Sequence, residues 1–484
     1  MISRVELSRK ARRRERRKAA RFQWRIGRKA LSISATFLLA TAAILFLPSE
    51  LTYEGRISLL GFLAATVLWT ATSLPASYSA LLAVMLIILL NGQSADLLFS
   101  SLSSEVVWLI LGAFVIGGAM EKTGIASRLA DSLLAQAKTT KSLLWLLTTA
   151  ILPLSIFVPS TSGRAAVMLP VYRAVTASVP DSRFKKAVAL LIPTVILLST
   201  TSTLIGAASH LIGVELLRSM TGEEITFLQW MLWGLPVGIL SSYLACAVIL
   251  WSFLPKDIRG HRLPVRSRET PPFSREEKMT AGVLAVTMLL WLSEPLHGLE
   301  LALVTMLSAL VLCFPSLGVM KWKEGLESVS WNLIVFVGAA LALGNSLIDS
   351  GAAEWLSHKV FAVQNHIDGS EWLTLILLIL LSVTSHLYIT SHTTRAMVLV
   401  PAFLYMAGDM GLNPAAVLFI ATAGMNFCLT FPVSSKALLI YQEIDPDSFR
   451  PSDLLQISGK VGVSYILLII MLYYTYWQWT GLQL

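Results

Sequence analysis

The chain has 484 residues and a mean hydropathy of +0.69; 55% of its residues are hydrophobic and 14% are charged. Soluble domains are about 45–50% apolar and about 25% charged, so the composition excludes a soluble globular protein. The net charge of +9 arises largely from residues 1–30, a basic run that precedes an apolar span and therefore indicates a cytoplasmic tail rather than a nucleic-acid arm. Cys246, Cys313 and Cys428 lie in apolar runs without metal-ligand spacing, which argues against a zinc site or a disulfide.

Apolar runs near the length of a membrane span follow one another along the chain. They lie at 31–48, 57–74, 76–91, 105–122, 142–158, 164–178, 184–218, 227–253, 279–295, 299–315, 331–348, 372–403, 414–440 and 460–480. Polar residues interrupt 142–178 and 372–403, so each is predicted to be a re-entrant helical hairpin, because irregular backbone at depth must be buried or line a cavity. The expected fold is an all-α polytopic membrane protein with about eleven transmembrane helices and two re-entrant hairpins.

Charge and repetition predict the domain order. A cytoplasmic tail (1–30) and an extra N-terminal span (31–54) precede a first repeat (55–253), a cytoplasmic linker (254–278) and a second repeat (279–484). The linker is rich in Lys and Arg, as expected of a cytoplasmic loop. Five spans separate the hairpins, so they enter from opposite faces and the repeats are inverted, each with five spans and a hairpin. The expected location is the cell (inner) membrane, with the N-terminus in the cytoplasm.

A polar peptide occurs once in each predicted hairpin. Residues 158–170 read VPSTSGRAAVMLP and residues 389–401 read ITSHTTRAMVLVP. Alignment on the last proline of each pairs Ser160 with Ser391, Thr161 with His392, Ser162 with Thr393, and Arg164 with Arg395. Clustered hydroxyls at two helix breaks favour contact with a ligand, because broken helices direct N–H groups at anions and carbonyls at cations.

The two arginines carry the strongest functional signal. An arginine at the centre of a membrane helix costs about 2.5–3.5 kcal/mol and needs a partner. Glu105, Glu294 and Glu300 lie at predicted span ends, so an acidic partner is not evident. A guanidinium fork matches carboxylate or sulfate oxygens, which predicts that Arg164 and Arg395 bind an anion. Capping of backbone carbonyls at the hairpin tips is the alternative.

A second polar break follows each hairpin, at 197–210 and at 426–436. Gly206 aligns with Ser434, and the breaks are expected to complete each half of the site. The expected residues are Thr203, Gly206, Ser434, Ser435 and Lys436. Lys436 is either a third cation at depth or a side chain that reaches the surface.

These motifs resemble the divalent anion/sodium symporter family of di- and tricarboxylate or sulfate transporters. That family carries a Ser-Asn-Thr signature at two hairpin tips, and the matching positions are 160–162 and 391–393. The resemblance implies a homodimer with a scaffold and a moving transport domain, working by an elevator-like shift. It also implies Na+ near Ser160, Thr161 and Gly206. A second Na+ near Ser391 and Ser434 is weakened by His392, because sodium prefers oxygen ligands.

The expected function is secondary active transport of a divalent anion, coupled to Na+ and without a tightly bound cofactor. Expected partners are the small anion and membrane lipid. A sodium-independent carboxylate exchanger is the alternative, since a fixed arginine can replace the charge of a sodium ion. An anion channel is an alternative of another class. A hydrolase using Ser391 and His392 is disfavoured, because adjacent residues rarely point at each other and no nucleophile–base–orienter set is evident. His210, His386 and His392 are either proton-coupling groups or satisfied hydrogen-bonding residues.

Overall fold

The structure is a computed structural model that describes Thr41, Ile44 and residues 50–72, 74–158, 160–263, 272–355 and 371–484. The basic tail (1–30), the span at 31–48 except Thr41 and Ile44, and the middle of the linker lie outside the described residues, so their assignments stay predictions. Within the described ranges the chain is helical, apart from an isolated β-bridge between Thr139 and Arg262.

The helices of the first half follow the predicted order. They are α2 (Tyr53–Ala71), α3 (Ala76–Leu89), α4 (Asp96–Leu102), α5 (Glu105–Thr123), α6 (Ile125–Leu134), α7 (Thr140–Ile151), α8 (Leu154–Phe157), α9 (Thr161–Val167), α10 (Leu169–Ser178), α11 (Ser182–Leu198), η1 (Ser199–Ser202), η2 (Leu204–Gly206), α12 (Ala208–Thr221), α13 (Phe227–Phe253) and α14 (Lys256–Arg259).

The helices of the second half repeat this pattern. They are α15 (Arg275–Leu292), α16 (Glu294–His297), α17 (Leu301–Leu312), α18 (Trp322–Glu327), α19 (Trp331–Asp349), α21 (Glu371–Thr384), η4 (Ser385–Leu387), α22 (His392–Met410), α23 (Pro414–Met425), η5 (Pro432–Ser434), α24 (Lys436–Glu443), α25 (Pro451–Thr475) and η6 (Trp477–Thr480).

Several segments are long and apolar enough to cross a membrane. In the described part of the chain they are Glu105–Thr123, Thr140–Phe157, Ser182–Ser202, Phe227–Phe253, Trp331–Asp349 and Pro451–Thr475. The all-α membrane class is therefore confirmed. The expected total of about eleven spans stays a prediction, because apolar helices such as α3 and α17 are shorter than the about 20 residues that a bilayer requires.

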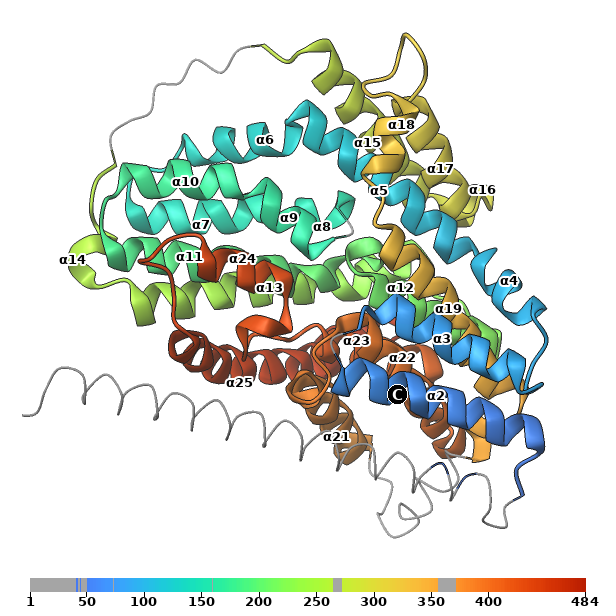
Figure 1. Cartoon of the computed structure of the whole chain (residues 1–484). Coiled ribbons are helices and arrows are strands. Elements are labelled where there is room, and N and C mark those ends of the chain that lie inside the picture. The colour runs from blue at the N-terminus through green and yellow to red at the C-terminus, as the bar shows by residue number, and fades with distance from the viewer. Residues whose placement is uncertain are drawn as a thin grey trace, which may run out of the picture.

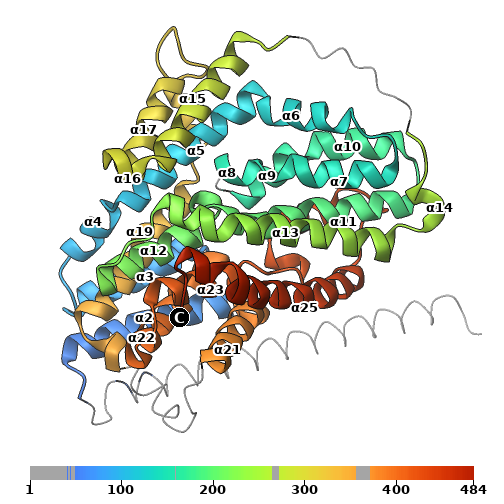
Figure 2. The same cartoon turned by 180° about the vertical axis from the view of Figure 1, so that it is seen from behind.

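The first predicted hairpin contains two helical arms, one ending with α8 and the other beginning with α9. The chain runs along α7 and α8 and returns along α9 and α10, so that α7 and α10 lie side by side (Figure 1 and Figure 2). In the second copy α22 runs without interruption through Pro401, whereas α9 ends at Val167 before Pro170. A proline lacks the backbone N–H that continues a helix, and the first arm breaks where the second does not.

The two halves pack across one another around the hairpin tips. α9 of the first half packs on α24 of the second, and α22 of the second half packs on α12 of the first. α12 and α24 both follow a second polar break, so these two contacts are equivalent under the repeat. α11 lies at the centre and is buried along most of its length. The packing therefore gathers both tips and both breaks in the interior.

The outer helices expose large apolar side chains, as expected for a protein solvated by lipid. One such surface runs along α17 and the turn that follows it, which we call the α17 stripe: Leu303, Leu307, Leu310, Phe314 and Leu317, each between 47% and 56% exposed. The spacing of three or four residues places Leu303, Leu307 and Leu310 on one face of α17, and Phe314 and Leu317 lie in the turn that follows. The stripe therefore borders either lipid or another protein.

Candidate functional site

The two hairpin tips have the same local geometry. The hydroxyl of Ser160 accepts a hydrogen bond from Gly163 N at 3.1 Å, and that of Ser391 accepts one from Thr394 N at 3.3 Å. Each serine is thus the N-cap of the helix that follows. Each also lies 3.0 Å from the hydroxyl two residues on, Ser162 or Thr393. The predicted pairing of the two peptides therefore corresponds to one repeated structure.

The hydroxyls at the hairpin tips cap their helices and are also only half-buried. The hydroxyls of Ser160 and Ser391 each accept one hydrogen bond from their own helix. This agrees in part with a purely structural role, in which the hydroxyls bond to their own helices and not to a ligand. Their side chains remain half-buried, as do Thr161 at the first position of α9 and His392 at the first position of α22. These groups line the ends of two helices that both begin inside the protein.

The Arg164 side chain is fully enclosed, with 0% of its surface exposed. Its Nη2 donates to the hydroxyl of Thr200 at 3.1 Å and to the carbonyl of Gly206 at 3.0 Å. Nε and Nη1 have no hydrogen-bond partner within the described chain. The guanidinium thus holds the second polar break of its own half with one nitrogen, and its other N–H groups lack acceptors.

Arg395 occupies the equivalent position in the second half and is also 0% exposed. Its Nη1 donates to the carbonyl of Phe427 at 3.5 Å, a weak bond, while Nε and Nη2 have no partner among the described residues. Phe427 belongs to the second polar break of this half. Both arginines therefore reach from a hairpin tip to the following break.

Neither guanidinium is paired with an acid. The ion pairs between described residues all involve other side chains, and Glu105, one of the acids considered from the sequence, pairs with Arg218 at 3.4 Å. Burial of a charge without a counterion is costly, and buried donors without acceptors add to that cost. The contacts to backbone carbonyls use only one nitrogen of each guanidinium. Capping of backbone carbonyls therefore does not explain the remaining N–H groups of Arg164 and Arg395.

The two second breaks share one backbone conformation. Each begins with an extended residue, Thr203 (φ −140°, ψ 151°) or Phe431 (φ −125°, ψ 140°), followed by a short 3₁₀ turn that ends at Gly206 or Ser434. A second extended residue then caps α12 or α24. The predicted alignment of Gly206 with Ser434 thus pairs residues at the same point of the repeated turn.

Gly206 is required where it stands. A Cβ atom at this position would lie 2.2 Å from the carbonyl oxygen of Thr200, which is backbone and cannot rotate away. The close approach brings the Thr200 hydroxyl and the Gly206 carbonyl to the same nitrogen of Arg164. The break is therefore shaped around the guanidinium.

The other residues expected at the second breaks differ in their surroundings. The Ser434 hydroxyl is buried without a partner in the described chain, and Ser435 caps α24 through Ala437 N at 3.2 Å. The Thr203 hydroxyl donates to the carbonyl of Ser155 at 2.9 Å, which ties the first break to α8. Lys436 is exposed, which fits the alternative that its side chain leaves the site.

Asn426 joins the two breaks and was missed in the sequence analysis. Its Nδ2 lies 2.7 Å from Nε2 of His210 and 3.0 Å from the hydroxyl of Thr201, both in the first half. Nδ1 of His210 lies 3.1 Å from the carbonyl of Thr203, so it must donate, and Nε2 then accepts from the amide. These roles require a neutral imidazole.

The other two candidate histidines, His386 and His392, lie in the second half. His386 contacts the carbonyl of Val383 and the hydroxyl of Thr430, both at 2.6 Å, so it is a satisfied buried group. Nε2 of His392 lies 3.1 Å from Sγ of Cys428. Thiol and imidazole are softer ligands than the hydroxyl and amide oxygens that Na+ prefers.

The architecture and site define a membrane transporter with a duplicated polar centre, and comparison with known proteins agrees. Residues 29–483 match the family described as the sodium:sulfate symporter transmembrane region. The chain therefore belongs to this family, and its resemblance to divalent anion/sodium symporters is confirmed.

Similar proteins include relatives described as the sodium-dependent dicarboxylate transporter SdcS. The one from Staphylococcus saprophyticus is 23% identical and covers 85% of this chain and 84% of its own. The one from Staphylococcus aureus RF122 is 22% identical and covers 91% and 90%. Among solved structures, the Alcanivorax borkumensis YdaH transporter aligns with a TM-score of 0.57 and 14% identity, covering 78% of this chain and 88% of its own. That similarity supports the fold alone.

Proposed function

We propose that this protein is a secondary active transporter in which Arg164 and Arg395 bind a divalent anion. The observation that carries the proposal is the pair of fully enclosed guanidinium groups without an acidic partner among the described residues. A di- or tricarboxylate, or sulfate, would supply acceptors for the free N–H groups. The tip hydroxyls of Ser160, Ser162, Ser391 and Thr393 would contribute further contacts, and relatives described as dicarboxylate transporters support this substrate class.

Enclosure of the arginines favours a carrier over a channel. Both side chains are 0% exposed, so an anion would reach them only after the protein opens. We propose that the hairpins enter the membrane from opposite faces and that the domain containing them moves as an elevator against a scaffold. In this arrangement the two hairpin tips would meet within the membrane, and the whole site would open to one side at a time. A homodimer in the inner membrane, with its N-terminus in the cytoplasm, completes the proposal.

Coupling is needed because the substrate is a dianion. Moving two negative charges into a cell against 100 mV costs about 4.6 kcal/mol. Co-transport of Na+ would offset this cost, and relatives described as sodium-dependent support Na+ as the coupling ion. No tightly bound cofactor is proposed.

Exchange of one anion for another is the second candidate, and the contacts of both breaks favour it. The carbonyl of Gly206, expected near Na+, accepts from the Arg164 guanidinium at 3.0 Å, and this positive charge would repel a cation. In the second half His392 lies on Cys428 instead of presenting an oxygen. The residues at both positions thus fit Na+ poorly.

Uptake by proteoliposomes separates the two forms of coupling. The purified protein is reconstituted, and radiolabelled succinate, citrate and sulfate are supplied with an inward Na+ gradient or with choline in its place. Loss of accumulation in choline supports symport. Accumulation that persists in choline but needs an internal dicarboxylate supports exchange. Absence of transport for every anion under all conditions would refute the proposed function.

A further inference from the structure

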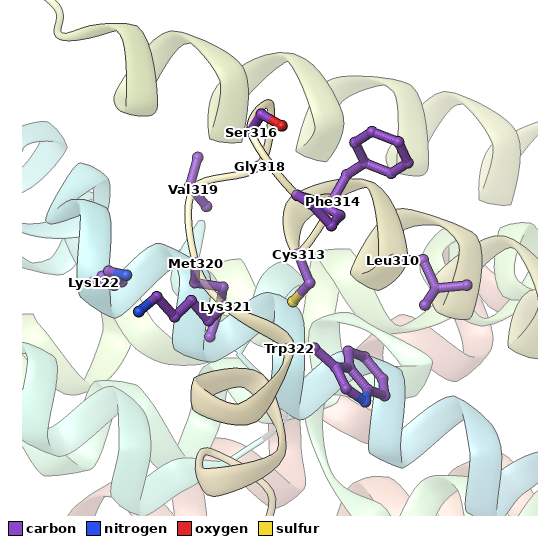
Figure 3. Close-up of a pocket in the computed structure, with 11 residues that line it drawn as sticks. Lys122, Leu310, Cys313, Phe314, Ser316, Gly318, Val319, Met320, Lys321 and Trp322 are labelled. Atoms are coloured by element: carbon purple, nitrogen blue, oxygen red, sulfur yellow. The ribbon is translucent and has the colours of Figure 1, made fainter.

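A cavity of about 740 Å³ lies far from the polar centre, at the loop between α17 and α18 (Figure 3). Its wall combines apolar side chains with two lysines: Lys122, Leu310, Cys313, Phe314, Pro315, Ser316, Gly318, Val319, Met320, Lys321 and Trp322. We propose that this cavity binds an anionic phospholipid of the cytoplasmic leaflet, with the headgroup phosphate at the lysines and an acyl chain along the α17 stripe.

The backbone of the loop between α17 and α18 keeps the cavity open. Val319 N donates to the carbonyl of Leu312 at 2.8 Å, which folds the chain back over the end of α17. A Cβ atom on Gly318 would lie 2.5 Å from that same carbonyl oxygen, so only glycine permits the return. Ser316 holds a positive φ of 69° in the same turn. The cavity is therefore preformed by a specific backbone path.

The charges of the cavity suit a single phosphate. Lys122 Nζ lies 2.6 Å from Glu324 Oε2, so its charge is partly balanced. Lys321 forms no ion pair with another described residue, and its side chain is exposed. A net positive charge therefore remains at the mouth, where a phosphodiester would supply the missing counterion.

The apolar part of the cavity continues into the α17 stripe. Leu310 and Phe314 belong to both, and they are 49% and 56% exposed. Trp322 stands at the rim and is 39% exposed, a placement typical of side chains at the level of the headgroups. A phospholipid could place its phosphate at the lysines, its glycerol region at Trp322 and an acyl chain on the α17 stripe. Free phosphate would leave the α17 stripe uncovered.

The cavity lies at the membrane face that the sequence predicts to be cytoplasmic. α15 packs against α17, with Thr287 donating to Ser308 at 2.7 Å. The first turn of α15 is tied to α6 by the pair Arg128–Glu277 at 2.8 Å, and it forms the end of the predicted linker 254–278. Anionic lipids of the cytoplasmic leaflet attract lysines at this level.

A second copy of the chain is the rival occupant of the α17 stripe. A two-fold interface apposes the same patch of both subunits, so it would gather Lys321 and Lys122 of both copies at one interface. Like charges in contact oppose such an interface, whereas they favour a negative headgroup.

Native mass spectrometry of the purified protein tests the proposal, with phosphatidylglycerol and phosphatidylcholine of identical acyl chains as probes. The wild type is expected to retain phosphatidylglycerol preferentially. Lys321→Gln should bind it about fivefold more weakly, the effect of removing one lysine near a charged surface. Lys321→Arg, which keeps the charge, should restore binding. Lys323→Gln is the matched control, since Lys323 is exposed on the same helix but does not line the cavity.

Thiol labelling gives a second readout that does not depend on affinity. Cys313 lines the cavity, so phosphatidylglycerol should slow its reaction with a small thiol reagent while phosphatidylcholine does not. Equal retention of both lipids, or equal loss in Lys321→Gln and Lys323→Gln, would overturn the proposal. Disulfide cross-linking between copies carrying Leu317→Cys would overturn it in favour of a subunit interface.

Discussion

Asn426 Nδ2 and His210 Nε2 lie 2.7 Å apart although 216 residues of sequence separate them. The residues beside this bond connect it to both arginines. Thr201, which also binds Asn426, follows the Thr200 that accepts from Arg164, and Phe427, which accepts from Arg395, follows Asn426. The bond therefore joins the two polar breaks on which the guanidinium groups rest.

Removal of the Asn426–His210 hydrogen bond should destabilise the protein. Asn426→Ala leaves the buried Nε2 of His210 without a donor, which costs about 1–3 kcal/mol. The measurement is thermal unfolding in detergent, followed by tryptophan fluorescence. Gln483→Ala, which removes an exposed amide, is the control and should change stability by less than about 0.5 kcal/mol. Equal stability of the two variants would show that the Asn426–His210 hydrogen bond does not contribute to the free energy of unfolding.

The close backbone approach at Gly206 predicts a strong effect of a single methyl group. Gly206→Ala places a Cβ atom 2.2 Å from the Thr200 carbonyl, so the break must shift, at a cost of about 1–3 kcal/mol. Anion uptake should fall because Arg164 loses its two acceptors together. Gly459→Ala in α25 is the matched control, since nothing lies within 4 Å of the added atom. Normal uptake by Gly206→Ala would contradict the role assigned to this turn.

Tyr441 ties α24 of the second half to α9 of the first. Its hydroxyl donates to the carbonyl of Ala165 at 3.1 Å, one residue from Arg164, and the side chain is fully buried. Tyr441→Phe should lower the free energy of unfolding by about 0.5–1.5 kcal/mol and slow transport. Tyr474→Phe, at a side chain 47% exposed, provides the comparison in the same unfolding assay. An unchanged melting temperature for Tyr441→Phe would remove this contact from the account.

The inverted arrangement predicts labelling from opposite faces. Cysteines at Lys138, before the first arm of the first hairpin, and at Asp409, at the end of α22, should react with a membrane-impermeant maleimide from the cytoplasmic and the outer side respectively, because both positions are exposed and five predicted spans separate the hairpins. Cys246 and Cys428 are buried and should react slowly, and Cys313, which lines the cavity between α17 and α18, is replaced by serine in this experiment. Lys256→Cys, in the predicted cytoplasmic linker, marks the inner face. Reaction of both test positions from one side would rule out inverted hairpins.

Most of the helices were predictable because a long apolar run has few alternatives. The run at 227–253 corresponds to α13, Phe227–Phe253, and the polar interruptions at 158–163 and 203–209 correspond to real breaks. The duplicated serines were predictable too, since a hydroxyl before a helix start is a recognisable cap. Local patterns of this kind arise from neighbouring residues and are visible in one sequence.

Contacts between the halves were not predictable in the same way. Asn426 and His210 each stand in an apolar stretch, which was a signal of importance, but nothing in one sequence indicates that they meet. The helix breaks before Pro170 but continues through Pro401, and this difference also depends on the packing around each arm. Lys436, which the sequence allowed at depth or at the surface, is exposed because α24 begins there with this side chain directed outward.

The most direct test of the account is anion uptake and binding by Arg164→Gln and Arg395→Gln in proteoliposomes, with Arg183→Gln as the control. Arg183 is exposed and pairs with Asp181 and Asp257, so its loss should leave transport near the wild-type rate. Each site variant should lose at least about tenfold in affinity for the dianion, since a charge-assisted hydrogen bond contributes about 1.5–3 kcal/mol. Dianion uptake at the wild-type rate and affinity in either folded site variant would contradict the central claim.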